Sequence, residues 1–128
     1  MKVAIPSKDR NPTLESELEA CPHDAASLVI YNTGSEETVY MEIDPDVRPC
    51  EHIEEFTKRG ITDLVSNACC MEHFQDFRNA GITVWKASPA VNIRDMINNF
   101  LLCGAWVVDE KSAAQQQKDY AKRLEKIS

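Results

Sequence analysis

The chain has 128 residues, of which 43% are hydrophobic and 27% are charged, and its formal net charge is −7. This length and composition suit one globular domain with its own core, and the chain is too short for two such domains. The acidic balance argues against a nucleic-acid-binding surface, and the sequence contains no apolar run of about eighteen residues that could cross a membrane.

The sequence contains five cysteines, an odd number. It starts directly with an apolar segment and shows no signal-peptide pattern, so we expect a cytoplasmic protein with reduced thiols. Clustered reduced cysteines indicate metal binding or redox chemistry rather than a disulfide framework.

Hydrophobic periodicity predicts the order β-β-β-α-β-α-β-α. The expected strands are Lys2–Pro6, Ser27–Asn32, Glu37–Ile43, Thr62–Ser66 and Ile82–Trp85. The expected helices are Cys50–Arg59, a segment from about Met71 to Ala80, and Val91–Leu102. We interpret residues 1–108 as one α/β domain and residues 109–128 as a polar helical tail.

Several residues predict how these elements end and which faces they bury. Gly60 and Gly81 each follow a helix and suit the left-handed residue that ends one, and Asn92 suits a helix start. In the third strand, Val39 and Met41 alternate with Tyr40, which predicts a half-buried strand that forms a hairpin with the second. The run from Glu15 to Glu19 is typical of a solvated acidic loop.

The element order predicts one mixed sheet. The first three strands form an antiparallel meander, and helical crossovers make the fourth and fifth strands parallel to the first. The first, third, fourth and fifth strands then end at the same edge, where the second starts. We therefore expect four loops to converge there: Ser7–Asp24, Asp44–Cys50, Asn67–Met71 and Lys86–Pro89.

Two adjacent cysteines, Cys69 and Cys70, lie where the fourth strand meets the following helix. This position is a common ligand site in open α/β sheets, and the helix N-terminus favours thiolate over thiol. Adjacent side chains diverge, so a polynuclear cluster suits this pair better than one tetrahedral ion, and the sequence has no C-x-x-C motif. Both cysteines could instead be small buried packing residues.

The other converging loops add further candidate ligands, namely Cys21, Cys50, His23, His52 and His73. Thiolates select zinc(II), copper(I) or iron–sulfur species over magnesium and calcium. A solvated or packing role is the alternative for each of these residues. Cys103 lies about three turns along the last helix, too far away, and is interpreted as a packing thiol.

The motifs together resemble the dinitrogenase iron–molybdenum cofactor biosynthesis family, including NifX and the C-terminal part of NifB. The opening MKVAIPS is similar to the family's M-K-I-A-I-P-S, and Leu14–Ser16 corresponds to its L-D-S. Gly60–Gly81 fits the family's G-V-D-V-V-I-x-G-G-I-G…A-G-I-x-V. The sequence departs from the pattern where Ala68–Cys70 replaces the G-I-G turn and where Cys21 replaces the histidine of H-F-G-R-A.

The resemblance implies a ribonuclease-H-like fold that binds a molybdenum- or iron-containing cluster. We therefore expect a non-catalytic carrier of an iron–sulfur or molybdenum-containing cluster, with a cluster donor or acceptor protein as its partner. Nuclease activity is not expected, because Lys2–Ser7 lacks the acidic residues that hold two divalent ions.

Two alternatives remain open. One is a thiol redox protein in which Cys69 attacks and Cys21 or Cys50 resolves. The other is a regulatory protein that has lost its ligand.

Overall fold

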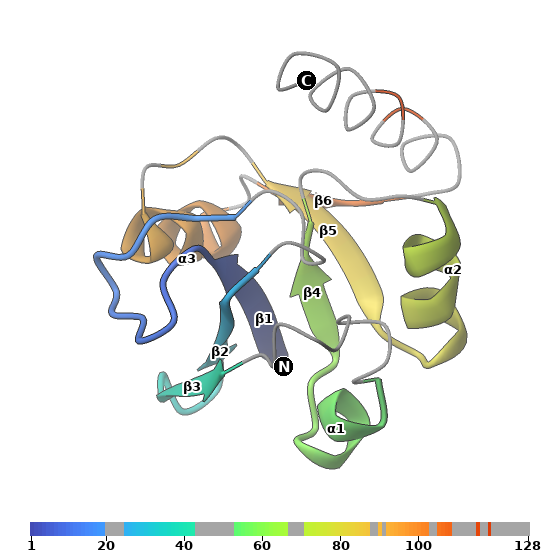
Figure 1. Ribbon diagram of the computed structural model, residues 1–128, viewed down its shortest axis with the longest axis horizontal. Helices are drawn as coiled ribbons and strands as arrows, with labels where there is room; N and C mark the ends of the chain where they lie inside the picture. The colour runs from blue at the N-terminus through green and yellow to red at the C-terminus, as the bar shows by residue number, and fades with distance from the viewer. Residues whose placement is uncertain are drawn as a thin grey trace.

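A mixed sheet of six strands lies at the centre of the computed structural model (Figure 1). The structure describes residues 1–19, 25–42, 53–66, 71–87, 90, 92–102, 105–108, 115 and 118. Its strands are β1 (Lys2–Ser7), β2 (Ser27–Asn32), β3 (Thr38–Glu42), β4 (Asp63–Val65), β5 (Thr83–Ala87) and β6 (Ala105–Val107). Its helices are α1 (Ile53–Lys58), α2 (Met71–Asn79) and α3 (Ile93–Leu101).

The strand order across the sheet is β3-β2-β1-β4-β5-β6. β1 and β2 are antiparallel, as are β2 and β3, whereas β4 is parallel to β1 and β5 is parallel to β4. These directions confirm the expected meander followed by helical crossovers. The α/β fold class that the sequence predicted is therefore confirmed.

The sheet has one strand more than the five that the sequence predicted. β6 pairs antiparallel with β5, with Val107 opposite Trp85 and Ala105 opposite Ala87. The three residues of this strand are all apolar, so they show no alternation of the kind that marks a half-buried strand. Pairing with β5 defines β6, so the strand becomes visible only in the folded chain.

Helices cover both faces of the sheet, with α1 and α2 on one face and α3 on the other (Figure 1). Phe56 of α1 stacks on Phe77 of α2, with 5.6 Å between ring centroids. On the opposite face, α3 buries Ile93, Met96 and Ile97. The two cores therefore share the central strands, whose side chains alternate between the faces.

The strand β3 is less buried than its alternating pattern predicted. Met41 is buried as expected, but Val39 is 49% exposed and Tyr40 is 44% exposed. β3 is at the edge of the sheet and has β2 as its neighbour on one side. A strand with one neighbour has less of its surface covered, so the apolar character of Val39 does not bury it.

The predicted helix ends agree with the structure. Gly60 and Gly81 have φ angles of 73° and 82°, in the left-handed region that a residue without Cβ adopts freely. Asn92 caps α3, because its side-chain oxygen accepts a hydrogen bond from the Asp95 backbone N–H. Most of the predicted tail helix lies outside the described residues, although Gln115 and Lys118 are helical and exposed. In the described part of the chain, no helix is long and apolar enough to span a membrane.

Candidate functional site

The carboxyl edge of the sheet consists of the ends of β1, β3, β4 and β5 and the starts of β2 and β6. Ser27 lies opposite both Ser7 of β1 and Glu42 of β3, which brings three strand termini into line. On the other side of β1, Val65 near the end of β4 lies opposite Trp85 of β5. The chain continues from this edge into the remaining segments of the predicted site, which are residues 20–24, 43–52, 67–70 and 88–89.

Six of the seven candidate ligands that the sequence predicted lie outside the described residues. They are Cys21, His23, Cys50, His52, Cys69 and Cys70. Cys103 also lies outside them, and His73 belongs to α2 with only its backbone described. The structure thus confirms the strand directions on which the expected convergence depends, and the ligand assignments stay predictions.

The described residues provide a framework for this edge rather than a complete metal site. Within the described ranges, no three histidine, cysteine, aspartate or glutamate side chains form a group that could hold a metal ion.

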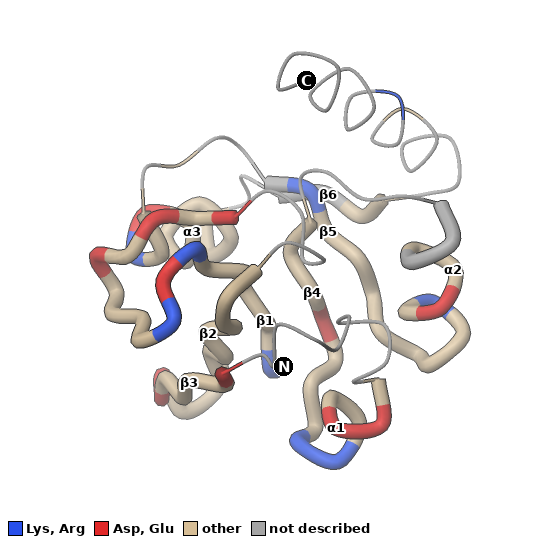
Figure 2. The backbone as a smooth tube through the Cα atoms, viewed as in Figure 1, with Lys and Arg blue, Asp and Glu red and all other residues tan. Residues whose placement is uncertain are grey.

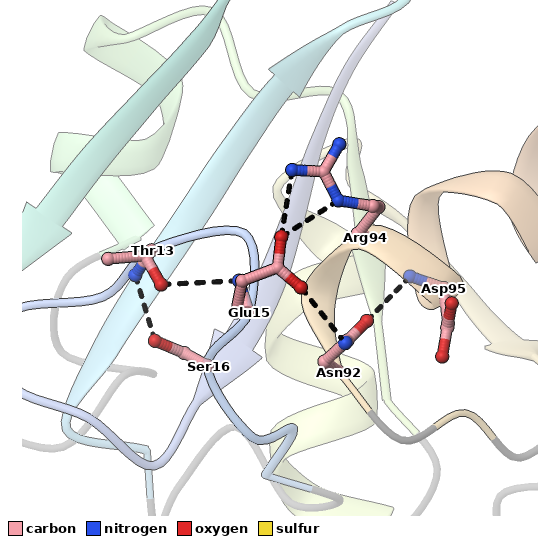
Figure 3. A network of polar contacts seen from close by, with 6 residues as sticks. All are labelled: Thr13, Glu15, Ser16, Asn92, Arg94 and Asp95. Atoms are coloured by element: carbon pink, nitrogen blue, oxygen red, sulfur yellow. Dashed lines mark hydrogen bonds and ion pairs between the residues drawn. The ribbon is translucent and has the colours of Figure 1, made fainter.

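The segment Leu14–Ser16 is attached to the start of α3 (Figure 3). The Ile93 and Arg94 backbone N–H groups donate to the carbonyl oxygens of Ser16 and Leu14, over 3.0 and 2.8 Å. The Glu15 carboxylate accepts from Arg94 Nε and Nη2, over 2.9 and 2.8 Å. The acidic run that begins at Glu15 is therefore not simply a solvated loop, and Ser16 within it is buried.

This attachment joins two parts of the predicted site that are distant in sequence. Residues 14–19 lead into the segment that contains Cys21, and Asn92 follows the loop after β5. Asn92 also donates from Nδ2 to Glu15 over 3.4 Å, so one side chain both caps α3 and contacts the loop. The ion pair itself is exposed and worth at most about 1 kcal/mol, so the backbone hydrogen bonds provide much of the attachment.

Two buried serines lie at the carboxyl edge, next to the loop that follows β1. Ser7 and Ser27 face each other across β1 and β2, and both are completely buried. Ser7 Oγ accepts from the Asp9 backbone N–H over 3.1 Å, and Ser27 Oγ donates to the Asp9 carbonyl oxygen. Neither serine has a local sequence pattern that predicts this role. These bonds fix the first turn of the loop that leads toward Cys21.

Asp63 is a buried carboxylate that the sequence analysis also missed. It lies at the start of β4, on the edge opposite the candidate site, and is 5% exposed. Its oxygens accept hydrogen bonds from Trp85 Nε1, over 2.8 Å, and from Thr62 Oγ1. This arrangement orients Trp85 within the sheet and suits a structural role better than a catalytic one.

Comparisons with known proteins show similarity at the level of structure. No family model matches the sequence, and no curated protein matches it. A protein from Thermotoga assigned to the NifB proteins and to the DUF35 family, solved by NMR, has 20% identity and a TM-score of 0.69, over 83% of this chain and 91% of that one. The apo form of the orange protein from Desulfovibrio gigas has 17% identity and a TM-score of 0.71, over 84% of this chain and 92% of that one.

Both alignments span most of each protein, so the similarity extends over the sheet and its helices. At such low sequence identity, this similarity is evidence of fold alone. The chain therefore has the α/β fold of these NifB-like and orange-protein structures.

Proposed function

We propose that the chain is a non-catalytic carrier that receives, holds and passes on an iron–sulfur or molybdenum-containing metallocluster. The cargo binds at the carboxyl edge, with Cys69 and Cys70 as its main ligands. Cys21 and Cys50 assist, and His23 and His52 are further candidate ligands. A cluster donor and a cluster acceptor protein are the expected partners.

The strand topology is the observation that supports this proposal most directly. Residues 43–52 follow the carboxyl end of β3, and residues 67–70 follow that of the β4 segment. Residues 20–24 lie just before the start of β2, at the same edge. These three segments contain four of the five cysteines. Segments that contain cysteines from distant parts of the sequence thus adjoin the ends of β2, β3 and β4 at one edge of a single sheet.

The chemistry of thiolates agrees with a cluster as cargo. Several thiolates on an open edge bind soft metals, and a preassembled cluster needs few protein ligands. An open edge also leaves the cargo accessible to a partner, whereas a structural zinc site needs four ligands in a closed shell. The similarity in fold to a protein assigned to NifB is further support.

Anaerobic reconstitution tests the proposal. The full chain is incubated with iron and sulfide, or separately with tetrathiomolybdate, and is then desalted and examined by UV–visible spectroscopy and metal analysis. We expect charge-transfer bands and about one cluster per chain in the wild type. The double variant Cys69→Ser/Cys70→Ser should lose most of this signal, because it removes two adjacent ligands.

A matched control is Cys103→Ser, which removes a thiol that is expected to lie away from the site. This variant should retain the wild-type spectrum and metal content. The proposal is wrong if the wild type binds no stoichiometric metal, or if the double variant binds as much metal as the wild type.

Thiol alkylation distinguishes a carrier from a redox protein. In a carrier, the loaded protein should be protected from alkylation, and a chelator should remove the protection. One unusually fast cysteine in metal-free protein, with no protection on loading, would favour the redox alternative.

A further inference from the structure

Lys86, the second-last residue of β5, lies at the carboxyl edge beside the end of β4. Trp85 is opposite Val65, and the Ser66 N–H donates to the Trp85 carbonyl oxygen over 2.7 Å. The parallel register therefore places Lys86 next to Ser66, the last described residue of the β4 segment. On its other side, Lys86 lies opposite Trp106 of β6.

Lys86 belongs to the face of the sheet that α1 and α2 cover. Side chains alternate along a strand, so Lys86 lies on the same face as the buried Val84. Trp85 lies on the other face, where its ring meets Phe100 edge-on at 5.3 Å between centroids. Lys86 is half-buried, and lysines in such positions cover apolar surface with their stems while the ammonium group reaches water.

Lys86 differs from Lys8, Arg10 and Arg94, the other basic residues near this edge, because those three form ion pairs with carboxylates. Lys8 pairs with Glu17 at 3.7 Å, Arg10 with Glu42, and Arg94 with Glu15 at 2.8 Å. These residues of both signs lie along the loop after β1, on β3 and on α3 (Figure 2). Lys86 has no ion pair or hydrogen-bond partner for its ammonium group among the described residues.

A lysine at this edge that has no carboxylate partner among the described residues is unexpected on an acidic chain, where carboxylates outnumber basic side chains by 21 to 14. Its charge favours any anion that approaches this part of the edge, and the effect is stronger where water is partly excluded. A bare metal cation approaching the same place is disfavoured by the same charge.

We propose that Lys86 is an anion-binding residue of the carboxyl edge, and that the cargo accepted there carries net negative charge. This inference rests on the proposed carrier function and names the class of cargo, which is an anionic metal–sulfide species rather than a bare divalent cation. Lys86 contacts the anion at the ends of β4 and β5, and it selects the cargo by charge in addition to the selection by thiolate ligands.

Titration of the full chain with tetrathiomolybdate, a dianion with strong absorption, tests this inference under anaerobic conditions. Lys86→Gln retains the stem but not the charge, and we expect about tenfold weaker binding, the usual size of one lost charge-assisted hydrogen bond. Lys86→Arg should bind within about twofold of the wild type, because the charge is retained. Increasing sodium chloride should weaken wild-type binding more steeply than binding by Lys86→Gln.

Two controls isolate the role of charge at this edge. Lys58→Gln removes a lysine at the end of α1, close to the start of β4, and should leave tetrathiomolybdate binding unchanged. Zinc(II) affinity should be equal or higher in Lys86→Gln, since loss of the positive charge does not weaken the binding of a cation. Unchanged far-UV circular dichroism and unfolding midpoint show that the variants are folded.

Equal tetrathiomolybdate affinity and equal salt dependence in wild type and Lys86→Gln would overturn the inference. Failure of the wild type to bind tetrathiomolybdate counts against molybdenum–sulfide cargo in the proposed function, and Lys86 is then tested by NMR with inorganic molybdate. The Lys86 and Ser66 amide signals should shift in the wild type and not in Lys86→Gln. Absence of a wild-type shift rejects the anion site as well.

Discussion

Asp63 shows how hydrogen bonds from neighbouring side chains accommodate a buried carboxyl group. The carboxylate is 5% exposed, and its hydrogen-bond donors are the Trp85 indole N–H and the Thr62 hydroxyl. Burial of a carboxylate is unfavourable unless its oxygens accept hydrogen bonds, and the indole in turn needs an acceptor. Asp63 and Trp85 therefore stabilise each other across two neighbouring strands.

Replacement of Asp63 by leucine should destabilise the fold by about 1–3 kcal/mol, because the partly buried Trp85 N–H loses its acceptor. Asp63→Asn keeps a side-chain oxygen in the same place and should cost about 1 kcal/mol or less. Urea unfolding followed by circular dichroism measures both values. Equal stability of the two variants would mean that the Trp85 hydrogen bond does not contribute.

At the scale of elements, the start of α3 depends on a loop from the other end of the sequence. Asn92 Oδ1 accepts from the Asp95 N–H over 2.9 Å, which is the local cap that the sequence predicted. Asn92 Nδ2 also donates to Glu15, and the backbone of α3 bonds to the carbonyl oxygens of Leu14 and Ser16. The helix start and the loop after β1 thus form one structural unit.

Asn92→Ala removes the cap and the contact with Glu15, and it should lower the free energy of unfolding by about 1 kcal/mol. Asn92→Ser retains an oxygen that can cap the helix and should recover most of that loss. Hydrogen exchange followed by mass spectrometry should show faster exchange in residues 14–18 as well as in α3 for the alanine variant. Faster exchange confined to α3 would argue against a shared unit.

At the scale of the whole molecule, the sheet connects two cores. Ala4 and Leu64 belong to the core under α1 and α2, while Val3 and Val65 on the same two strands belong to the core under α3. Neither face can lose its packing without exposing strands that the other face needs. Domains of this size commonly unfold in one cooperative transition.

A core substitution on one face should therefore be detected on the other. Phe77→Leu replaces the ring that stacks on Phe56 with a smaller side chain and should destabilise the protein by roughly 1–3 kcal/mol. In a Trp106→Phe background, Trp85 fluorescence reports the α3 face, and circular dichroism reports the whole chain. Both signals should shift to the same lower urea midpoint. Separate midpoints for the two signals would show that the faces unfold independently.

Local patterns in the sequence were sufficient for much of the fold. The five predicted strands, the positive φ angles at Gly60 and Gly81 and the Asn92 cap all agree with the structure. Each of these features depends on side chains within a few residues, so periodicity and capping rules describe them well. The exposure of Val39 was missed, because it depends on the position of β3 at the edge.

The candidate site was predictable only in part. Alternation of strands and helices determined that the cysteine-containing segments extend from one edge, because crossover rules restrict strand direction. The residues that organise the described part of this edge had no local signal. Ser7 and Ser27 are ordinary residues of strand segments, and only their neighbours in the folded chain give them a role.

The sequence by itself determined the element types, their order and the directions of the main strands, because hydrophobic period and turn residues act over short distances. The positions of Cys21, Cys50, Cys69 and Cys70 also predict soft-metal binding, and this assignment stays a prediction. Tertiary structure decided the pairing of β6, the burial of Asp63 and the contact between Glu15 and Arg94, which are 79 residues apart. Such contacts depend on where the folded chain brings distant segments together, and no local pattern encodes that proximity.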